Sequence, residues 1–257
     1  KMLELYHDWD SLMSFKVRAC LAEKNLDWTS RLIELTRFDH LKEEYLRLNP
    51  NGVVPTLVHD DQIIIESSAI NEYLDDVFPN PSLRPSSPVE RARMRAWVKY
   101  GDDVLHHGVR PATFELMIKP RLKSYSTEEL EELIAAHPQP ARAEAYRKAA
   151  ADEIDFDSIG HTVRVADEAF ARMELSLSSH KWLAANTFSL ADVMSMSFVD
   201  RIEHLGLGFL LERRPCVVDW AERLKTRDSY SNSVPPSDSR LPSPDPAAIS
   251  RLSQLFK

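Results

Sequence analysis

Residues 49–57 have the sequence Asn-Pro-Asn-Gly-Val-Val-Pro-Thr-Leu, and they decide more about this chain than any other stretch. A proline that opens a strand after a Gly-containing turn can hold a cis peptide bond, which turns the preceding backbone outward. Val54 would then offer its N–H and C=O to an extended peptide ligand by strand-like pairing. The stretch therefore predicts a peptide-binding edge at Val54 and Pro55.

A second polar signal follows at Glu66-Ser67, where a helical pattern begins. The free N–H groups and the dipole of a helix N-terminus attract a carboxylate. The Ser67 hydroxyl adds a donor, and Glu66 can accept a hydrogen bond from an ammonium group. Singly, Pro55 would only open a strand and Ser67 would only cap a helix. Together, a strand-like slot beside receptors for a carboxylate and an ammonium suits the γ-glutamyl end of glutathione.

The apolar patterning around these residues predicts an α/β unit. Alternating residues indicate strands, and apolar side chains at helical spacing, such as Val17 with Leu21 or Ile70 with Leu74 and Val77, indicate helices. The predicted elements, in order, are a strand at 3–6, a helix at 14–24, a strand at 29–35, a helix at 40–48, a hairpin of 56–58 with 63–65, and a helix that starts at Ser67 and stops before Pro79. The order β-α-β-α-β-β-α is that of a thioredoxin-like domain.

The rest of the chain has helical periodicity, with Trp97, Val98, Gly101, Val104 and Leu105 fitting one helix face. The stretch Ser189 to Asp192 is a capping-box pattern, and Ser126-Thr127-Glu128-Glu129 opens an acidic helix. We therefore expect a thioredoxin-like domain at 1–79, a Pro/Ser linker at 80–88, an all-α domain at 89–229 with an insertion around 124–159, and a Ser/Pro-rich tail at 230–257 that wraps the surface or lacks fixed structure.

Composition excludes several classes of protein. With 43% apolar and 28% charged residues, the chain has the composition of a globular protein. Its net charge of −8 disfavours a nucleic-acid partner, which requires a basic surface. No apolar run approaches the ~20 residues that span a membrane. The first residues lack the apolar stretch of a secretion signal, and two cysteines make no disulfide framework, so we expect a cytoplasmic protein.

The motifs resemble a known family. Leu-Asn-Pro-x-Gly-x-Val-Pro-x-Leu at 48–57, then Glu-Ser-x-x-Ile-x-x-Tyr-Leu at 66–74, resembles the glutathione-site motif of cytosolic glutathione transferases. The stretch 11–24 is similar to the Ser-containing first helix of their plant-type and zeta classes. The insertion, through Ile118-Lys119, Ser126 to Glu132, Pro138-Gln139-Pro140 and Tyr146-Arg147, resembles the bacterial lignin β-etherases, which use glutathione to cleave β-aryl ethers.

The resemblance implies a glutathione site and a thiolate chemistry. Val54, Pro55, Glu66 and Ser67 would hold glutathione as a cosubstrate, and His40 would lie near its glycine carboxylate. A serine hydroxyl and the first helix's N-terminus would stabilise the thiolate. Alignment with the plant-type and zeta classes favours Ser11, whereas the etherase resemblance favours Ser14, which we rank slightly higher.

A second substrate would lie between the two domains, where small-molecule sites often occur. By position alone, Trp9, Met13, Tyr100, His107 and Phe114 are candidate contacts for a small aromatic electrophile. Adjacent His106 and His107 point to different helix faces, so we expect no metal site. Asp102 and Asp103 are expected to face solvent or a dimer partner.

Three hypotheses about function stay open at this point. The first is cleavage of lignin-type β-aryl ethers by attack of the glutathione thiolate. The second is a glutathione transferase that acts on another electrophile, such as a halide, an epoxide or an isomerising ketone. The third is a non-catalytic subunit, one half of a heterodimer. The resemblance implies a dimer, either of identical chains or with a related transferase.

Overall fold

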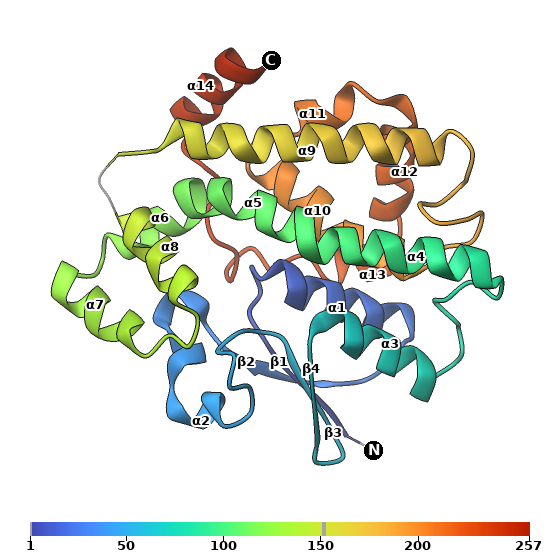
Figure 1. The fold of residues 1–257 in the computed structure, drawn as a ribbon, viewed down its shortest axis with the longest axis horizontal. Coiled ribbons are helices and arrows are strands. Elements are labelled where there is room, and N and C mark those ends of the chain that lie inside the picture. Colours follow the sequence, from blue (N-terminus) through green and yellow to red (C-terminus); the bar gives the residue numbers. More distant parts are fainter. Residues whose placement is uncertain (1, 151–152) are drawn as a thin grey trace.

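The computed structural model describes residues 2–150 and 153–257. Residues 1, 151 and 152, which the sequence analysis assigned to the first domain and to the insertion, lie outside the described residues. The N-terminal part is a four-stranded mixed sheet in which β1 pairs parallel to β2 and antiparallel to β3, and β4 closes the other edge (Figure 1). The strands are β1 (Leu3–His7), β2 (Thr29–Leu32), β3 (Thr56–His59) and β4 (Gln62–Ile65).

Helices α1 and α3 pack together over the sheet, on the side that faces the rest of the protein (Figure 1). Leu5 and Leu57 of the two central strands are fully buried, and they share one core with Val17 of α1 and Ile70 of α3. The predicted order β-α-β-α-β-β-α and the thioredoxin-like fold are therefore confirmed. The helices of this part are α1 (Leu12–Glu23), α2 (Glu43–Leu46) and α3 (Ser67–Val77).

Two predicted elements are shorter than the patterning indicated. The strand expected over 29–35 ends at Leu32, because the Leu35 N–H donates to the Asp8 carboxylate and the chain turns into a 3-10 helix. The helix expected over 40–48 shrinks to α2, because Asp39–Leu41 forms a 3-10 turn and Lys42, with a φ of −70° and a ψ of 145°, is extended.

Within the described residues from Pro88 onward, every regular element is helical. The segments are α4 (Pro88–Tyr100), the π-helical turn η3 (Gly101–Leu105), α5 (His106–Thr113), the π-helical turn η4 (Phe114–Ile118), α6 (Lys119–Leu122), α7 (Thr127–Ala135), α8 (Pro140–Ala150), α9 (Phe156–Leu177), α10 (Leu190–His204), α11 (Phe209–Glu212), α12 (Pro215–Lys225), α13 (Asp228–Ser231) and α14 (Pro246–Phe256). None of these described helices has the length and apolar character needed to cross a membrane.

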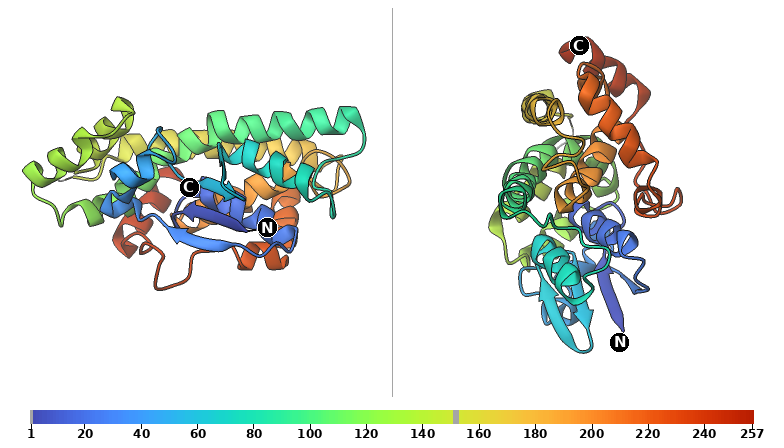
Figure 2. Two further views of the ribbon diagram at one scale, coloured as in Figure 1. Left: turned by 90° about the horizontal axis from the view of Figure 1, so that it is seen from below. Right: turned by 90° about the vertical axis from the view of Figure 1, so that its right-hand side faces the viewer.

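The sheet and the helical domain share one apolar core. Helix α1 packs against α10, and the core cluster runs without a break from Leu5 and Val17 to Met194 and Phe198. Figure 2 shows the consequence for the shape: the sheet and the N-terminus lie at one end, and the helices and the C-terminus at the other. Gly101 lets η3 approach α10, because a Cβ there would lie 2.2 Å from the Met194 sulfur.

Helices α6, α7 and α8 form a separate lobe beside α2 (Figure 1). They have their own apolar cluster, in which Phe38 and Leu41 of the N-terminal part pack with side chains of the lobe. Helix α7 is the acidic helix predicted from Ser126, and it begins with a capping box of Ser126 and Glu129. The lobe is thus held on the N-terminal part by apolar contacts, with Tyr146 buried between them; its buried members are Leu122, Leu130, Ile134, Ala143, Tyr146 and Ala149.

The tail contains more structure than its Ser/Pro composition suggested. Arg18 of α1 donates to the Ser233 carbonyl, and the Leu241 N–H donates to the Asp10 carboxylate. Helix α14 then packs back on the domain through Leu252, which is fully buried. These contacts bring the tail alongside the loop between β1 and α1.

The capping box predicted at Ser189, at the start of α10, is confirmed, and its Asp192 carboxylate accepts further hydrogen bonds from outside the helix. One carboxylate oxygen of Asp192 accepts from the Leu183 N–H and the Trp220 indole, both at 3.0 Å, and the other accepts from the Ser189 N–H at 3.1 Å. Burial raises the pKa of Asp192 to about 6. The fully buried carboxyl therefore ties α10 to α12 and to the loop before α10.

Asp192→Ala is expected to lower the free energy of unfolding by about 3 kcal/mol, because it leaves three buried donors without their acceptor. Urea unfolding followed by circular dichroism measures this loss. Asp219→Ala is the control, since Asp219 is exposed and only pairs with Arg223 within α12. Equal losses in the two variants would contradict the role given to Asp192.

Candidate functional site

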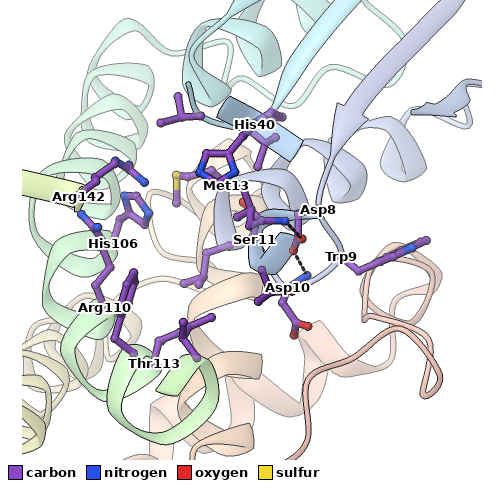
Figure 3. A pocket seen from close by; sticks show the side chains of 18 of the residues that line it. Asp8, Trp9, Asp10, Ser11, Met13, His40, His106, Arg110, Thr113 and Arg142 are labelled. Carbon is purple, nitrogen blue, oxygen red and sulfur yellow. Dashed lines mark hydrogen bonds between the residues drawn. The ribbon is translucent and has the colours of Figure 1, made fainter. Parts of the chain in front are cut away.

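A cavity of about 540 Å³ lies between the sheet domain and the helical domain. Its walls come from the β1–α1 loop, the segment before β3, the start of α3, α5, α8 and the tail around Leu241 (Figure 3). Every binding residue that the sequence analysis proposed for the first ligand lines this cavity: His40, Val54, Pro55, Glu66 and Ser67.

The segment before β3 presents an unpaired backbone edge. The Val54–Pro55 peptide bond is cis, as the sequence predicted. Tyr45 and Asn49 both donate to the Val53 carbonyl, at 2.6 and 2.9 Å, and so fix the loop in place. Among the described residues, nothing hydrogen-bonds to the N–H or C=O of Val54. The edge can therefore pair with an extended ligand.

The start of α3 supplies donors to the same cavity. Glu66, the residue before the helix, has a φ of 70° and makes no side-chain hydrogen bond to the helix end. The N–H groups of the first turn, beginning at Ser67, are the ones that a helix leaves without internal partners. Glu66 is exposed and Ser67 is buried at the cavity wall. This arrangement offers an anion site next to a free carboxylate.

Beneath the α3 N-terminus lies a buried lysine that sequence reasoning missed. The Lys16 ammonium donates to the hydroxyl of Ser67 at 3.2 Å and to the Asp102 carboxylate at 2.8 Å, and it also donates to Ser68. Burial lowers the pKa of Lys16, while the Asp102 carboxylate raises it. The expectation that Asp102 faces solvent or a partner chain is wrong, because its charge pairs with Lys16 across the domain boundary.

The two candidate hydroxyls occupy different environments. Ser11 lines the cavity and caps α1: its side-chain oxygen accepts from the Ser14 N–H at 3.2 Å. Ser14 is fully buried, does not line the cavity, and its oxygen accepts from the Asp8 N–H. The ranking of Ser14 above Ser11 is therefore corrected. The helix begins at Leu12, not at Ser14, so Ser11 takes the capping position at its exposed end.

Of the side chains proposed for a second substrate, Trp9, Met13, His107 and Phe114 line the cavity. Tyr100 does not, and this proposal is withdrawn. Its ring packs edge-on against Trp97, with a centroid distance of 5.9 Å, and the Arg172 guanidinium lies 4.5 Å from its centroid.

The cavity also contains titratable groups that the sequence analysis did not single out. Asp8 lies in the loop before α1, and burial raises its pKa to about 6. On the opposite side, α5 and α8 contribute His106, Arg110 and Arg142 (Figure 3). Burial lowers the pKa of His106 to about 3. His106, Arg110 and Arg142 lie far from 49–57 in sequence, and Arg142 reaches the cavity because α8 packs against η4 and α6.

Over residues 2–150 and 153–257, no cluster of three or more His, Cys, Asp and Glu side chains is arranged to hold a metal ion. The cavity lining within these residues also contains no cysteine: Cys20 is buried in α1, and Cys216 lies at the start of α12. The nucleophilic and acid–base groups at hand are therefore hydroxyls, carboxylates and imidazoles.

Two protein-family models match the chain: the N-terminal domain of glutathione S-transferases over residues 5–82, and their C-terminal domain over residues 139–228. Protein LigF of Sphingobium sp. SYK-6 is 31% identical over 88% of this chain and 90% of its own length. A tetrachloro-p-hydroquinone reductive dehalogenase of Sphingobium chlorophenolicum is 26% identical, over 90% of this chain and 95% of its own.

Solved structures show the same likeness. The crystal structure of β-etherase LigF matches with a TM-score of 0.83 and 30% identity, covering 91% of this chain and 98% of that one. Glutathione transferase F7 of Populus trichocarpa matches with a TM-score of 0.73 and 25% identity, covering 90% and 97%.

His40 is 2% exposed, and burial lowers its pKa to about 3. Between this value and about 6.5, the unfolded chain binds a proton at His40 that the folded chain lacks, so stability falls as the pH falls. We expect acidification from pH 7 to pH 5 to cost the wild type about 2 kcal/mol of unfolding free energy through His40 alone.

His40→Gln should remove the contribution of His40 to this pH dependence. Between pH 7 and pH 5 the variant should therefore lose about 2 kcal/mol less unfolding free energy than the wild type. Urea unfolding of the wild type and the variant at both pH values gives the two losses. Subtracting one loss from the other removes the contributions of the titratable groups that both proteins contain. His161→Gln, at an exposed histidine of α9, is the control. Parallel pH dependence in the wild type and His40→Gln would show that His40 is not held neutral by the fold.

Proposed function

Since the chain belongs to the glutathione S-transferase family, we propose that it cleaves β-aryl ether bonds of lignin-derived aromatics with the thiolate of glutathione. One observation carries the proposal: the Val54 edge, the α3 N-terminus and the Ser11 hydroxyl converge on one cavity. The named relative LigF, a β-etherase, supports the choice of reaction. Its identity of 31% leaves the substrate to be tested directly.

In this proposal glutathione lies extended along the cavity wall. Its cysteinyl backbone pairs with Val54, whose N–H and C=O face no protein partner among the described residues. The γ-glutamyl carboxylate binds at the first turn of α3 and Ser67, and the γ-glutamyl ammonium donates to Glu66. Lys16 donates to the Ser67 oxygen, and the Ser67 hydroxyl, which donates to the Met13 sulfur at 3.4 Å, turns to the carboxylate when glutathione binds. His40 lies beside the glycine end.

The thiolate is stabilised at the start of α1. A free thiol has a pKa near ~8.5, so only a few per cent is ionised at neutral pH. Ser11 uses an oxygen lone pair to cap the helix, which leaves its O–H proton free to donate to sulfur. The positive end of the α1 dipole acts in the same direction. One charge-assisted hydrogen bond of ~1.4 kcal/mol increases the thiolate population about tenfold.

The thiolate then attacks the ether-bearing carbon next to the substrate ketone. A C–S bond forms as the C–O bond breaks, and the electron pair leaves with the aryloxide, which takes a proton from solvent and departs as a phenol. The glutathione conjugate is the second product. Met13, His107 and Phe114 contact the aromatic electrophile, and Trp9 borders the same opening.

Among other reactions, reductive chemistry of the kind named in the dehalogenase relative has less support. Release of a bound glutathione by thiol exchange needs a second thiol, and among the described residues neither cysteine lines the cavity. Transfer to a halide or an epoxide stays the alternative. For the whole protein we propose a cytoplasmic dimer, formed by two copies or with a related transferase, in which this chain is catalytic.

The direct test is incubation with glutathione and a β-aryl ether ketone, with chromatography of the released phenol and of the glutathione conjugate. We expect both products in equal amounts, and neither without glutathione. Absence of phenol together with turnover of an aryl halide would replace ether cleavage by the alternative. Absence of turnover with both, while glutathione binds, would favour a non-catalytic subunit.

Ser11→Ala should raise the pKa of bound glutathione by about one unit and slow turnover about tenfold at pH 7, with a smaller loss at higher pH, where bulk ionisation replaces the hydroxyl's effect. The ultraviolet thiolate absorbance of bound glutathione against pH measures the shift. Ser14→Ala is the matched control, because Ser14 is buried behind Ser11. A shift in Ser14→Ala instead would return the role to Ser14, and no shift in either would leave the helix N-terminus as the stabiliser.

A further inference from the structure

Three arginines that line the cavity from the helical side form no ion pair with any described residue: Arg110 of α5, Arg121 of α6 and Arg142 of α8. Arg121 is exposed, whereas Arg110 and Arg142 are partly buried. The side chain of Arg110 makes no hydrogen bond with any described residue, and that of Arg142 donates only to the Gln139 amide oxygen, at 3.0 Å. By contrast Arg201, another cavity arginine, donates to the Thr113 hydroxyl and to the Asp10 carbonyl.

The guanidinium groups of Arg110 and Arg142 repel each other across this wall. Burial, with Arg142 as the next cause, lowers the pKa of Arg110 to about 10, so it stays charged at neutral pH. The neighbouring imidazoles add no charge, since burial lowers the pKa of His106 and of His40 to about 3. The Glu66 carboxylate partly offsets the charge of Arg142, whereas no carboxylate acts on Arg110. A partly buried cation without an ion pair is costly to keep unless a ligand supplies an anion.

The surroundings of Arg110 are aromatic. Its guanidinium lies 5.5 Å from the centroid of the Phe114 ring, and the Tyr146 ring lies 5.3 Å from that of Phe114. Both rings line the cavity. Figure 3 shows Arg110, His106 and Arg142 on one side of the pocket, across from Ser11 and Met13. An aromatic ring that packs on Phe114 would therefore present a substituent to a cation.

Arg142 and Arg110 differ in their relation to the glutathione segment. Gln139, which accepts from Arg142, donates through its amide to the Asn51 carbonyl at 3.1 Å, so Arg142 is linked to the loop before Val54. Arg110 has no such link and packs on Phe114. Arg142 thus borders both parts of the cavity, whereas Arg110 belongs to the part left for the electrophile.

We propose that Arg110, assisted by Arg142, binds a carboxylate on the aromatic electrophile, so that the preferred second substrates are aromatic acids. This inference rests on the glutathione binding of the proposed function. It sets the substrate class of the same site: an aryl ether that carries a carboxylate on its ring is bound with its ring on Phe114 and its acid group against the two guanidinium groups. A bidentate pair with Arg110 would supply the orientation.

The test uses two thioether conjugates that cannot react further, S-benzylglutathione and S-(4-carboxybenzyl)glutathione, with glutathione itself as reference. Calorimetry of the wild type should show the carboxylated conjugate binding about tenfold more tightly than the neutral one. Arg110→Gln should abolish this preference and leave the affinity for glutathione unchanged. Arg147→Gln removes a charge from the outer face of α8, where Arg147 pairs with Glu131, and should keep the preference.

Equal affinity of the wild type for the two conjugates would overturn the inference, and so would a preference that survives in Arg110→Gln. A third contradicting result is that Arg110→Gln weakens glutathione and both conjugates equally, because Arg110 would then bind the glycine carboxylate. Glutathione monoethyl ester identifies that case, since Arg110→Gln should not weaken it. If neither glutathione nor a conjugate binds the wild type, the glutathione site of the proposed function fails and this inference fails with it.

Discussion

The buried ion pair between Lys16 and Asp102 is the interaction on which the rest of the site depends. It joins α1 of the sheet domain to the π-helical turn η3 of the helical domain, and it lies directly under the first turn of α3. A buried ammonium is tolerated only when its hydrogen bonds are satisfied, and here two serines and one carboxylate satisfy them. One charge therefore links the Ser67 hydroxyl at the start of α3 to the helical domain, in addition to the apolar core that the two domains share.

The parts of the site that could be predicted are those in which one short stretch of sequence forms the binding group. Residues 49–57 and Glu66-Ser67 present backbone groups and a helix end, and both follow from short motifs, so the sequence placed them correctly. Ser11 and Ser14 are three residues apart, nearly one helical turn, and only the observed start of the helix at Leu12 shows which hydroxyl reaches the cavity. Lys16 was not predicted, because its partner Asp102 lies 86 residues further along the chain.

Long-range packing explains the other errors. A π-helical turn bonds each residue to the fifth along and so shifts the phase of the helix, which separates Tyr100 from the cavity face that His106 and Arg110 occupy after η3. The cavity wall opposite Ser11 is built from α5 and from α8, and α8 is held in place by the apolar cluster around Phe38 and Tyr146. The insertion thus acts on the site by carrying charge and aromatic surface into it, which periodicity alone does not reveal.

The hydrogen bond from the Leu241 N–H to the Asp10 carboxylate has a consequence for how the protein is made. Asp10 belongs to the loop that leads into α1, and it is synthesised 231 residues before Leu241. The sheet strands span 3–65, so all of them are made long before the tail wall of the cavity exists. During synthesis the binding site therefore stays unfinished until Leu241 has left the ribosome and can reach Asp10.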